Sequence, residues 1–509
     1  MQGEVVDLGR AVGADQRVQQ PRLHRLAHDR HTVATTYDMR WWRDGRDSDE
    51  FGERDIERVG HGVEGLKGGV AAPCLKLGER CSGDARAAGE LDHRQPTDAT
   101  QSTQVRRQRC FVGVTHMANI IAIMPTLLGG RRPLARRDGR EEEAMVVSRL
   151  QHIPGIGVNV IGDQADAVAD PEMLRLENLD TDLRPPAVAL ETTRRAIDSD
   201  QANSYLPFEG HRDLRAAAAR HVERLSGRGY DPDRECVSVA GGLNGVLNTL
   251  LAVTEPGSEV VLSDPIYAGL INRIRLAGAV PRHVRAIPTD DGWHTDPAEL
   301  ASAVGPRTAA ILLMSPAMPT GAVFDHTHLN ALADPVQRHG VWVIYDAAME
   351  RIRFDERPSV HPASHPGLAD RVITIGSASK ELRMIGWRVG WVVAPAPIMA
   401  DIALVGMTNV VCQVGIAQQA VAAALSAPDA DADVTAATRV WQQRCDVILD
   451  QLADYPIIRP HGGWSLLLDT EAVGLTPAEA SRRLFEQGRI AATPMNGWGP
   501  SSDRYLRLV

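Results

Sequence analysis

One lysine of this chain stands among residues that could do chemistry together. Residues 377–390 read SASKELRMIGWRVG, so Lys380 follows Ser377 and Ser379 closely and precedes Arg388. Two hydroxyls and a guanidinium that converge on one point suit a phosphate dianion. A lysine held beside them could form an imine with a phosphorylated aldehyde. A lysine exposed at the start of a surface helix is the alternative.

Two further segments carry polar groups that such a ligand would need. VSVAGGLNGVLNTLLAV predicts a strand, a glycine turn and a helix, whose first amides near Leu243 and Asn244 could bind phosphate. VWVIYD ends in Asp346, and a buried carboxylate there needs a cationic partner, such as a protonated pyridine nitrogen. The glycine turn could equally be a tight connection, and Asp346 could be an ordinary helix N-cap.

The elements that must position these residues follow an α/β pattern from about residue 150. Short apolar runs such as EVVLSD, TAAILLMS, VWVIYD and RVITIG alternate with helical patterns such as DLRAAAARHVERL. Strands rich in valine and isoleucine without alternation are typical of a parallel sheet that is covered on both faces. We therefore expect a doubly wound α/β architecture, in which ligands bind at the carboxyl ends of the strands.

Composition and charge exclude several classes of protein. The chain of 509 residues has a net charge of −10, which provides no electrostatic footprint for nucleic acid or an anionic membrane. Its six cysteines form no CxxC pair and have no histidine at zinc-ligand spacing, so we expect no metal and a reducing compartment. The start MQGEVVDLGR lacks a signal pattern, and the apolar stretch 111–128 contains His116, Asn119 and Pro125. A cytoplasmic location is the expectation.

Residues 1–144 differ from the rest of the chain in composition and in hydrophobic patterning. They contain clusters such as RWWRDGRDSDE and show no sustained period of 3.6 or 2 residues. Such a segment buries too little apolar surface to offset the entropy of ordering it. We expect either a disordered extension or an over-long gene prediction, with translation beginning at Met145.

The motifs in this order resemble those of the class I/II aminotransferases, the fold-type I pyridoxal-phosphate enzymes, over residues 153–509. S-x-S-K followed by G-x-R-x-G occurs without deviation at 377–390. The other matching elements are Tyr205, Gly210 and Leu214-Arg215 of the Y-x-x-x-x-G-x-x-x-L-R motif, Pro265-Ile266-Tyr267 of the P-x-Y motif, and Arg507 in the final DRYLRLV.

The resemblance implies a role for each matched residue. Lys380 would carry pyridoxal 5'-phosphate as a Schiff base and act as general base, and Asp346 would face the ring nitrogen. Tyr267 would stack on the ring, and Arg507 would hold the substrate's α-carboxylate. Trp464 of HGGWSLLLD and Met318 would line the substrate side of the site, with a core tryptophan as the equal alternative for Trp464. The phosphate would be held by Gly242, Leu243, Asn244, Ser377, Ser379 and Arg388, with Tyr205 reaching the partner's cofactor across a homodimer interface.

The resemblance also implies a division of the chain. It predicts a segment at 150–200 that contributes to a small domain, a large cofactor-binding domain at 201–400, and a small α+β domain at 401–509. The large domain would hold a mainly parallel sheet covered by helices. The predicted reaction moves an amino group between an amino acid and a 2-oxo acid.

The sequence departs from the family pattern at several positions. Met318 and Met349 stand where an asparagine and a tyrosine usually donate hydrogen bonds to the cofactor's ring oxygen, and a thioether cannot donate. We therefore expect a Schiff base that keeps its proton to higher pH, unless the methionines are core residues and other groups donate. The stretch RLENLDTDLRPP lacks the family's substrate-contacting glycine, and the chain stops at Val509, which predicts truncation of a closing helix.

These departures keep other functions open. A carbon–sulfur β-lyase or another pyridoxal-phosphate reaction is possible on the same scaffold, because the site and not the fold sets the reaction. A cofactor-binding regulator with an N-terminal DNA-binding domain is a second alternative, although residues 1–144 show no helix-turn-helix pattern. A non-catalytic relative is a third.

Overall fold

A large, mainly parallel sheet forms the centre of the protein. The computed structural model describes residues 148–155 and 157–509, so the expectations for residues 1–144 concern residues outside these ranges. The sheet has the strand order β2-β9-β8-β7-β6-β3-β4-β5. Its strands are β2 (Cys236–Val239), β3 (Glu259–Asp264), β4 (Val280–Thr289), β5 (Gly292–Thr295), β6 (Thr308–Met314), β7 (Trp342–Asp346), β8 (Val372–Ser377) and β9 (Gly390–Val393).

The order and direction of the strands confirm the predicted α/β class. The run β4-β3-β6-β7-β8 is parallel throughout, whereas β9 pairs antiparallel with both β8 and β2, and β5 pairs antiparallel with β4. Every residue of β3 and β8 is buried, as the continuous apolar runs predict.

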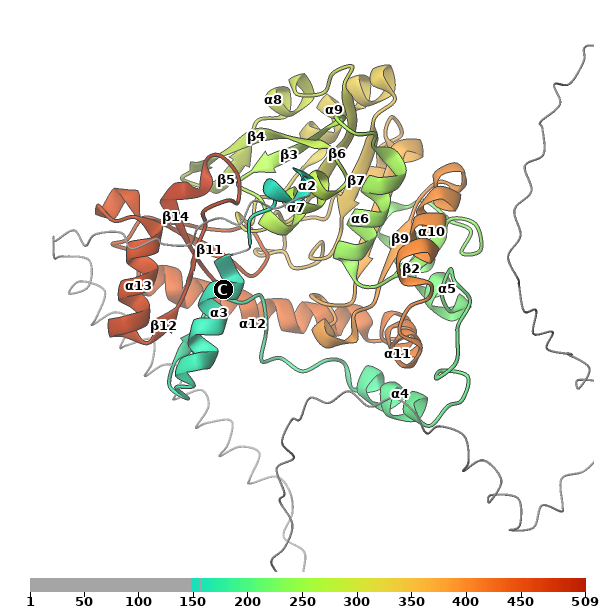
Figure 1. Ribbon diagram of the computed structural model, residues 1–509, viewed down its shortest axis with the longest axis horizontal. Helices are drawn as coiled ribbons and strands as arrows, with labels where there is room; N and C mark the ends of the chain where they lie inside the picture. Colours follow the sequence, from blue (N-terminus) through green and yellow to red (C-terminus); the bar gives the residue numbers. More distant parts are fainter. Residues whose placement is uncertain (1–147, 156) are drawn as a thin grey trace, which may run out of the picture. The chain divides into compact units, whose positions relative to one another are not determined.

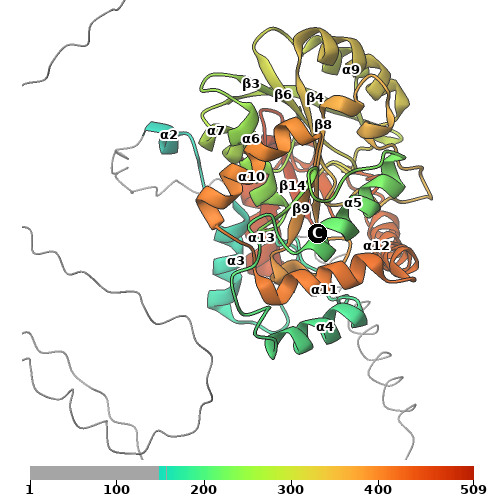
Figure 2. The same ribbon diagram turned by 90° about the vertical axis from the view of Figure 1, so that its right-hand side faces the viewer.

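Two apolar clusters cover the two faces of this sheet. Neighbouring residues of one strand alternate between them: Ile344 belongs to a cluster with Val246 and Leu250 of α6, and Val343 to a cluster with Leu329 of α9. Successive side chains of a strand point to opposite faces, so both faces need helical cover. Figure 2 shows α6, α7 and α10 on one side of the strands and α9 on the other.

The helices begin and end at recognisable signals. In α9, Asp325 and His328 form a capping box, and Gly340 closes the helix in the left-handed conformation. The described helices are α2 (Ser148–Gln151), α3 (Gly157–Val168), α4 (Ala187–Ile197), α5 (Arg212–Ser226), α6 (Gly242–Val253), α7 (Ala268–Leu276), α8 (Pro297–Ser302), α9 (His326–His339), α10 (Ala396–Val410), α11 (Gly415–Ser426), α12 (Ala430–Gln451) and α13 (Pro477–Gly488). Within the described residues, none of them is long and apolar enough to cross a membrane.

A second, antiparallel sheet lies near the C-terminus. It has the order β10-β11-β14-β13, and a separate parallel pair joins β1 to β12. Figure 1 shows β11, β14 and α13 grouped to one side of the large sheet. The strands are β1 (Leu174–Arg175), β10 (Ile457–Ile458), β11 (Leu466–Asp469), β12 (Ile490–Ala491), β13 (Thr493–Pro494) and β14 (Tyr505–Leu508). The pairing of β1 with β12 brings the 150–200 segment to the C-terminal elements, while the domain boundaries stay a prediction.

Close packing between β8 and β9 gives a test of the fold. Gly376 pairs with Trp391 across these strands, and a β-carbon at Gly376 would overlap the indole of Trp391. We expect Gly376→Ala to lower the free energy of unfolding by about 1–3 kcal/mol, the usual cost of overpacking a core. Chemical denaturation measures this change.

Gly305→Ala is the matched control, because nothing lies within 4 Å of a β-carbon built at Gly305. Its effect should stay below about 1 kcal/mol. Equal stability of the two variants would contradict the packing of β8 against β9.

Candidate active site

The ends of neighbouring strands bring the predicted site residues together. Asp346 is the last residue of β7 and lies opposite Ile375 of β8, which ends at Ser377. Lys380 follows in the loop after β8, and Gly241 lies in the connection from β2 to α6. The carboxyl ends of parallel strands share one edge, which is where such folds bind ligands.

Lys380 is half-buried and held on two sides. Its Nζ donates a hydrogen bond to the carbonyl oxygen of Leu179 at 2.9 Å and lies 4.9 Å from the centre of the Trp464 ring. Burial lowers the pKa of Lys380 to about 8, and the positive charges of Arg507 and Arg388 act in the same direction. An amine with this pKa is partly neutral near physiological pH, as a nucleophile or base requires.

Asp346 is a buried carboxylate without a cation bound to it. Its Oδ1 accepts one hydrogen bond, from the backbone N–H of Ala348 at 3.2 Å. Burial raises the pKa of Asp346 to about 6, and Arg273 and Lys380 oppose that shift from a distance. Among the described residues no ion pair to Asp346 is formed. A cationic ligand group at this position would relieve the cost of burying the charge.

Arg388 and the serines form a polar cradle beside Lys380. Arg388 has the left-handed φ of 55°, and its Nη1 donates to Ser379 Oγ at 3.3 Å and to the Ile385 carbonyl at 2.9 Å. Ser377 Oγ accepts from the Ser379 backbone N–H at 3.2 Å. Gly241 has a φ of 82°, which favours glycine, and a β-carbon there would lie 2.6 Å from Arg388 Nη2 and would displace the guanidinium.

The first turn of α6 faces the same cradle. The N–H groups of Gly242 and Leu243 stand at the helix start, where no acceptor within the helix is available. Asn244 is already engaged, because its backbone N–H donates to the Gly241 carbonyl at 3.1 Å and its Oδ1 accepts from Ala240 at 3.1 Å. The turn thus offers two free amides and the positive end of the helix to an anion.

Arg507 brings a second cationic group to the site from β14. The side chain is fully buried, and its Nη2 donates to the Glu177 carbonyl, while Nε and Nη1 have no hydrogen-bond partner among the described residues. Burial lowers the pKa of Arg507 to about 10, with Tyr267 and Glu177 acting in the opposite direction. The guanidinium keeps unpaired N–H donors, which a carboxylate could accept from.

Aromatic rings surround these charges. The Arg507 guanidinium lies 4.8 Å from the centre of the Trp498 ring, and Tyr267 meets Trp498 edge-to-face at 5.4 Å. The backbone N–H of Tyr267 donates to the Met318 carbonyl at 3.0 Å. Tyr267 is therefore fixed by its backbone close to the predicted substrate side.

Met318, Met349 and Trp464 belong to one buried apolar cluster. Trp464 packs against Trp441 with ring centres 4.9 Å apart, and its Nε1 has no hydrogen-bond partner. The methionines add apolar surface at positions where the family pattern has hydrogen-bond donors. In the stretch without the expected glycine, Leu179 instead presents its carbonyl oxygen to Lys380.

Tyr205 does not join this cluster within the described part of the chain. Its side chain is 85% exposed and lines a surface hollow with Asp200, His211 and Arg212. A tyrosine so exposed on one chain is available to a second copy, which is the role that the resemblance predicts.

Several residues near the site carry no signal in the sequence. Leu179, Trp498, Trp441 and Arg273 reach it through contacts between distant segments, and Glu177 meets Arg507 across 330 residues. Arg273 lies on α7, the helix after Tyr267, but Arg275 is a second arginine on the same helix, so residue type and position alone do not single it out. Arg273 Nε donates to the Leu243 carbonyl at 2.9 Å.

Comparison with known proteins identifies the family. Residues 174–508 match the family described as aminotransferase class I and II, and the chain belongs to it. The protein is thus an aminotransferase, an enzyme that transfers amino groups.

Individual relatives agree with this assignment. The arginine–pyruvate transaminase AruH of Pseudomonas aeruginosa is 32% identical over 344 residues, which cover 66% of this chain and 85% of that protein. The solved N-succinyldiaminopimelate aminotransferase of Mycobacterium tuberculosis is 30% identical with a TM-score of 0.67, covering 71% of this chain and 94% of its own. Aspartate aminotransferase from Thermus thermophilus, solved with maleate, has a TM-score of 0.66 at 27% identity, covering 74% and 95%.

The setting of Lys380 predicts an unusual titration. We expect the amine in the ligand-free protein to titrate near pH 8, because burial and nearby arginines disfavour the ammonium form. Competitive acetylation over a pH series, with mass spectrometry of the Lys380 peptide, measures this midpoint. Arg507→Leu should raise it, since the positive charge of Arg507 lowers it in the native protein.

Arg482→Leu serves as the control, because Arg482 is an exposed residue of α13 that forms an ion pair with Glu486. A midpoint near the ordinary value of 10.5 in the native protein would show that Lys380 lies in solvent.

Proposed function

We propose that this aminotransferase uses pyridoxal 5'-phosphate, held as a Schiff base on Lys380. The observation that carries the proposal is the meeting of three groups at one sheet edge: the Lys380 amine, the buried carboxylate of Asp346 and the cradle of Arg388. Lys380 is also the only lysine after residue 76. When bound, the cofactor supplies an electron sink for the carbanion that forms at the substrate's α-carbon.

The described residues fit the chemical groups of this cofactor. The free amides of Gly242 and Leu243, with Ser377, Ser379 and Arg388, would hold the phosphate. Asp346 would accept a hydrogen bond from the protonated ring nitrogen, and this cationic partner would offset the cost of its burial. Tyr267 would pack against the ring. Asn244 would act by bracing the turn, since its amide and side chain are engaged within the protein.

Arg507 and Lys380 would act on the substrate. The guanidinium of Arg507, which keeps unpaired N–H donors, would bind the α-carboxylate of an amino acid or a 2-oxo acid. Lys380, once released by the incoming amino group, would take the proton from the α-carbon as general base. Its pKa near 8 suits both the removal and the return of a proton. Trp464 and Met318 would border the substrate's side chain.

The exposed Tyr205 supports a homodimer. Its ring would complete the phosphate site of the partner subunit, so each active site would need two chains. We place the protein in the cytoplasm, because the cysteines of the described residues, Cys236, Cys412 and Cys445, are all free thiols.

A carbon–sulfur β-lyase is the second candidate, and the buried pair Met318 and Met349 favours it. With no hydrogen-bond donor at either position, the cofactor's ring oxygen would be less stabilised than in the family pattern. A change of that kind could alter the reaction that follows proton removal.

Visible absorption of the protein with pyridoxal phosphate tests the proposal. We expect a yellow imine band that Lys380→Ala abolishes and that bleaches to the amine form of the cofactor with individual amino acids. The panel should include arginine, aspartate and N-succinyldiaminopimelate, the substrates and products that the names of relatives suggest. Lys76→Ala is the matched control, since it removes a lysine from outside the described residues.

The outcomes separate the candidates. Bleaching with one amino acid and restoration by a 2-oxo acid establish amino transfer and name the donor. Pyruvate release from a cysteine conjugate, without the amine form, would favour the lyase. A band that survives Lys380→Ala would contradict the assignment of Lys380.

A further inference from the structure

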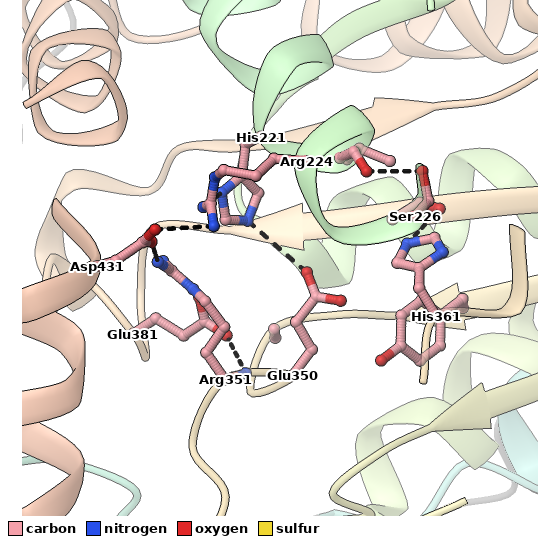
Figure 3. Close-up of polar contacts among 12 residues, drawn as sticks. His221, Arg224, Ser226, Glu350, Arg351, His361, Glu381 and Asp431 are labelled. Carbon is pink, nitrogen blue, oxygen red and sulfur yellow. Dashed lines mark hydrogen bonds and ion pairs between the residues drawn. The ribbon is translucent and has the colours of Figure 1, made fainter. Parts of the chain in front are cut away.

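A buried cluster of charged residues includes Glu381, the residue that follows Lys380 in the chain. Figure 3 shows Glu381 and His221 pointing toward the consecutive residues Arg351 and Glu350, with Asp431 and Arg224 also in contact with the cluster. Glu350 and Arg351 lie in the segment that follows Asp346. The cluster therefore joins the two segments that carry the predicted catalytic groups.

Glu381 makes the contacts at the centre of this cluster. Its side chain is 6% exposed; Oε1 accepts from the backbone N–H of Arg351 and Oε2 from Arg351 Nε, each at 2.7 Å. One carboxylate thus binds both the main chain and the side chain of Arg351. The backbone carbonyl of Glu381 also accepts from Arg383 Nη1 at 2.9 Å, so the residue after Lys380 is fixed at both ends.

The outer arm of the cluster holds Arg351 from the other side. Arg351 Nη1 donates to Asp431 Oδ1 at 2.8 Å, and Asp431 Oδ2 lies 2.9 Å from Arg224 Nη1. Asp431 is on α12 and is exposed, in contrast to Glu381. The two ends of the Arg351 guanidinium thus bind one buried and one exposed carboxylate.

Burial shifts the pKa values of the inner groups of the cluster. Burial raises the pKa of Glu350, and burial together with Arg351 lowers the pKa of His221 to about 3. His221 is then uncharged at neutral pH, and the charged contacts are those of Glu381 and Asp431 with Arg351 and of Asp431 with Arg224. Removing one partner of a buried ion pair costs far more stability than the intact pair contributes, because the other charge is left buried and unpaired.

We propose that Glu381 is a positioning residue, which acts through Arg351 to fix Lys380 relative to Asp346. This proposal rests on the proposed function, because it concerns the amine that would form the imine. The amine and the ring-nitrogen partner act on opposite ends of one ligand, so their separation must match its length. Glu381 bonds the loop of Lys380 to the segment after Asp346, and it sets that separation without touching the ligand.

The test separates formation of the imine from binding of the phosphate. Full-length protein without cofactor is mixed with pyridoxal phosphate, and the rate of imine formation is followed by absorption. Pyridoxine 5'-phosphate, which has no aldehyde, gives the affinity of the cradle alone. Glu381→Gln keeps the shape of the side chain but removes its charge and one of its two acceptors. Asp431→Asn, the control, weakens the outer contacts of Arg351 and Arg224 and leaves those of Glu381 in place.

We expect Glu381→Gln to slow imine formation roughly ten- to a hundredfold, since misplacement of a reacting group by about 1 Å costs that much. Its affinity for pyridoxine 5'-phosphate should stay at the native value, and Asp431→Asn should match the native protein in both. Native imine formation in Glu381→Gln, an equal loss of pyridoxine phosphate affinity, or equal slowing in Asp431→Asn would each overturn the proposal.

Two further outcomes are decided in the same assay. If Glu381→Gln does not fold, Arg351→Lys replaces it, because lysine keeps the charge but cannot bind both carboxylates. Slow imine formation in that variant supports the proposal, and a native rate overturns it. Failure of the proposed function looks different, since the native protein would then form no imine at all.

Discussion

The placement of one amine near one buried carboxylate is the constraint on which the rest of this structure depends. Asp346 ends β7 and Lys380 follows β8, and the pairing of these two adjacent parallel strands fixes where the loops after them begin. Both groups are partly stripped of water, which lowers the pKa of the lysine to about 8 and raises that of the aspartate to about 6. Both shifts favour the neutral forms, so a ligand with a cationic ring and a reactive aldehyde would gain from meeting them.

The second sheet contributes a buried guanidinium to the region of the site. Arg507 enters from β14 as a buried guanidinium with two unpaired nitrogens, and its backbone is held between Leu467 and Thr493 by strand pairing. An unpaired buried charge is costly, and a substrate carboxylate would repay that cost. The proposed catalytic amine and the proposed carboxylate-binding guanidinium thus come from different parts of the fold, Lys380 next to the indole of Trp464 and Arg507 next to that of Trp498.

The sequence predicted the sheet and the residues at its edge because those signals are local. Apolar runs identify the strands, and Lys380, Asp346 and Arg388 follow or flank those strands directly. The contacts that complete the site are not local: Leu179 meets Lys380 across 201 residues, and Arg351 meets Glu381 across 30. No periodicity or spacing records which carbonyl an amine will reach. The engagement of Asn244 within its own turn was equally hidden, because it depends on the backbone geometry of that turn.

Reduction of the protein–cofactor complex with borohydride, followed by peptide mass spectrometry, tests the central claim most directly. Borohydride converts an imine into a stable amine, so the modified lysine carries the mass of the cofactor. We predict that the label is found on the peptide containing Lys380 and on neither of the peptides with Lys67 or Lys76. An unlabelled Lys380, or a label shared among the three lysines, would contradict the assignment of this residue as the one that holds the cofactor.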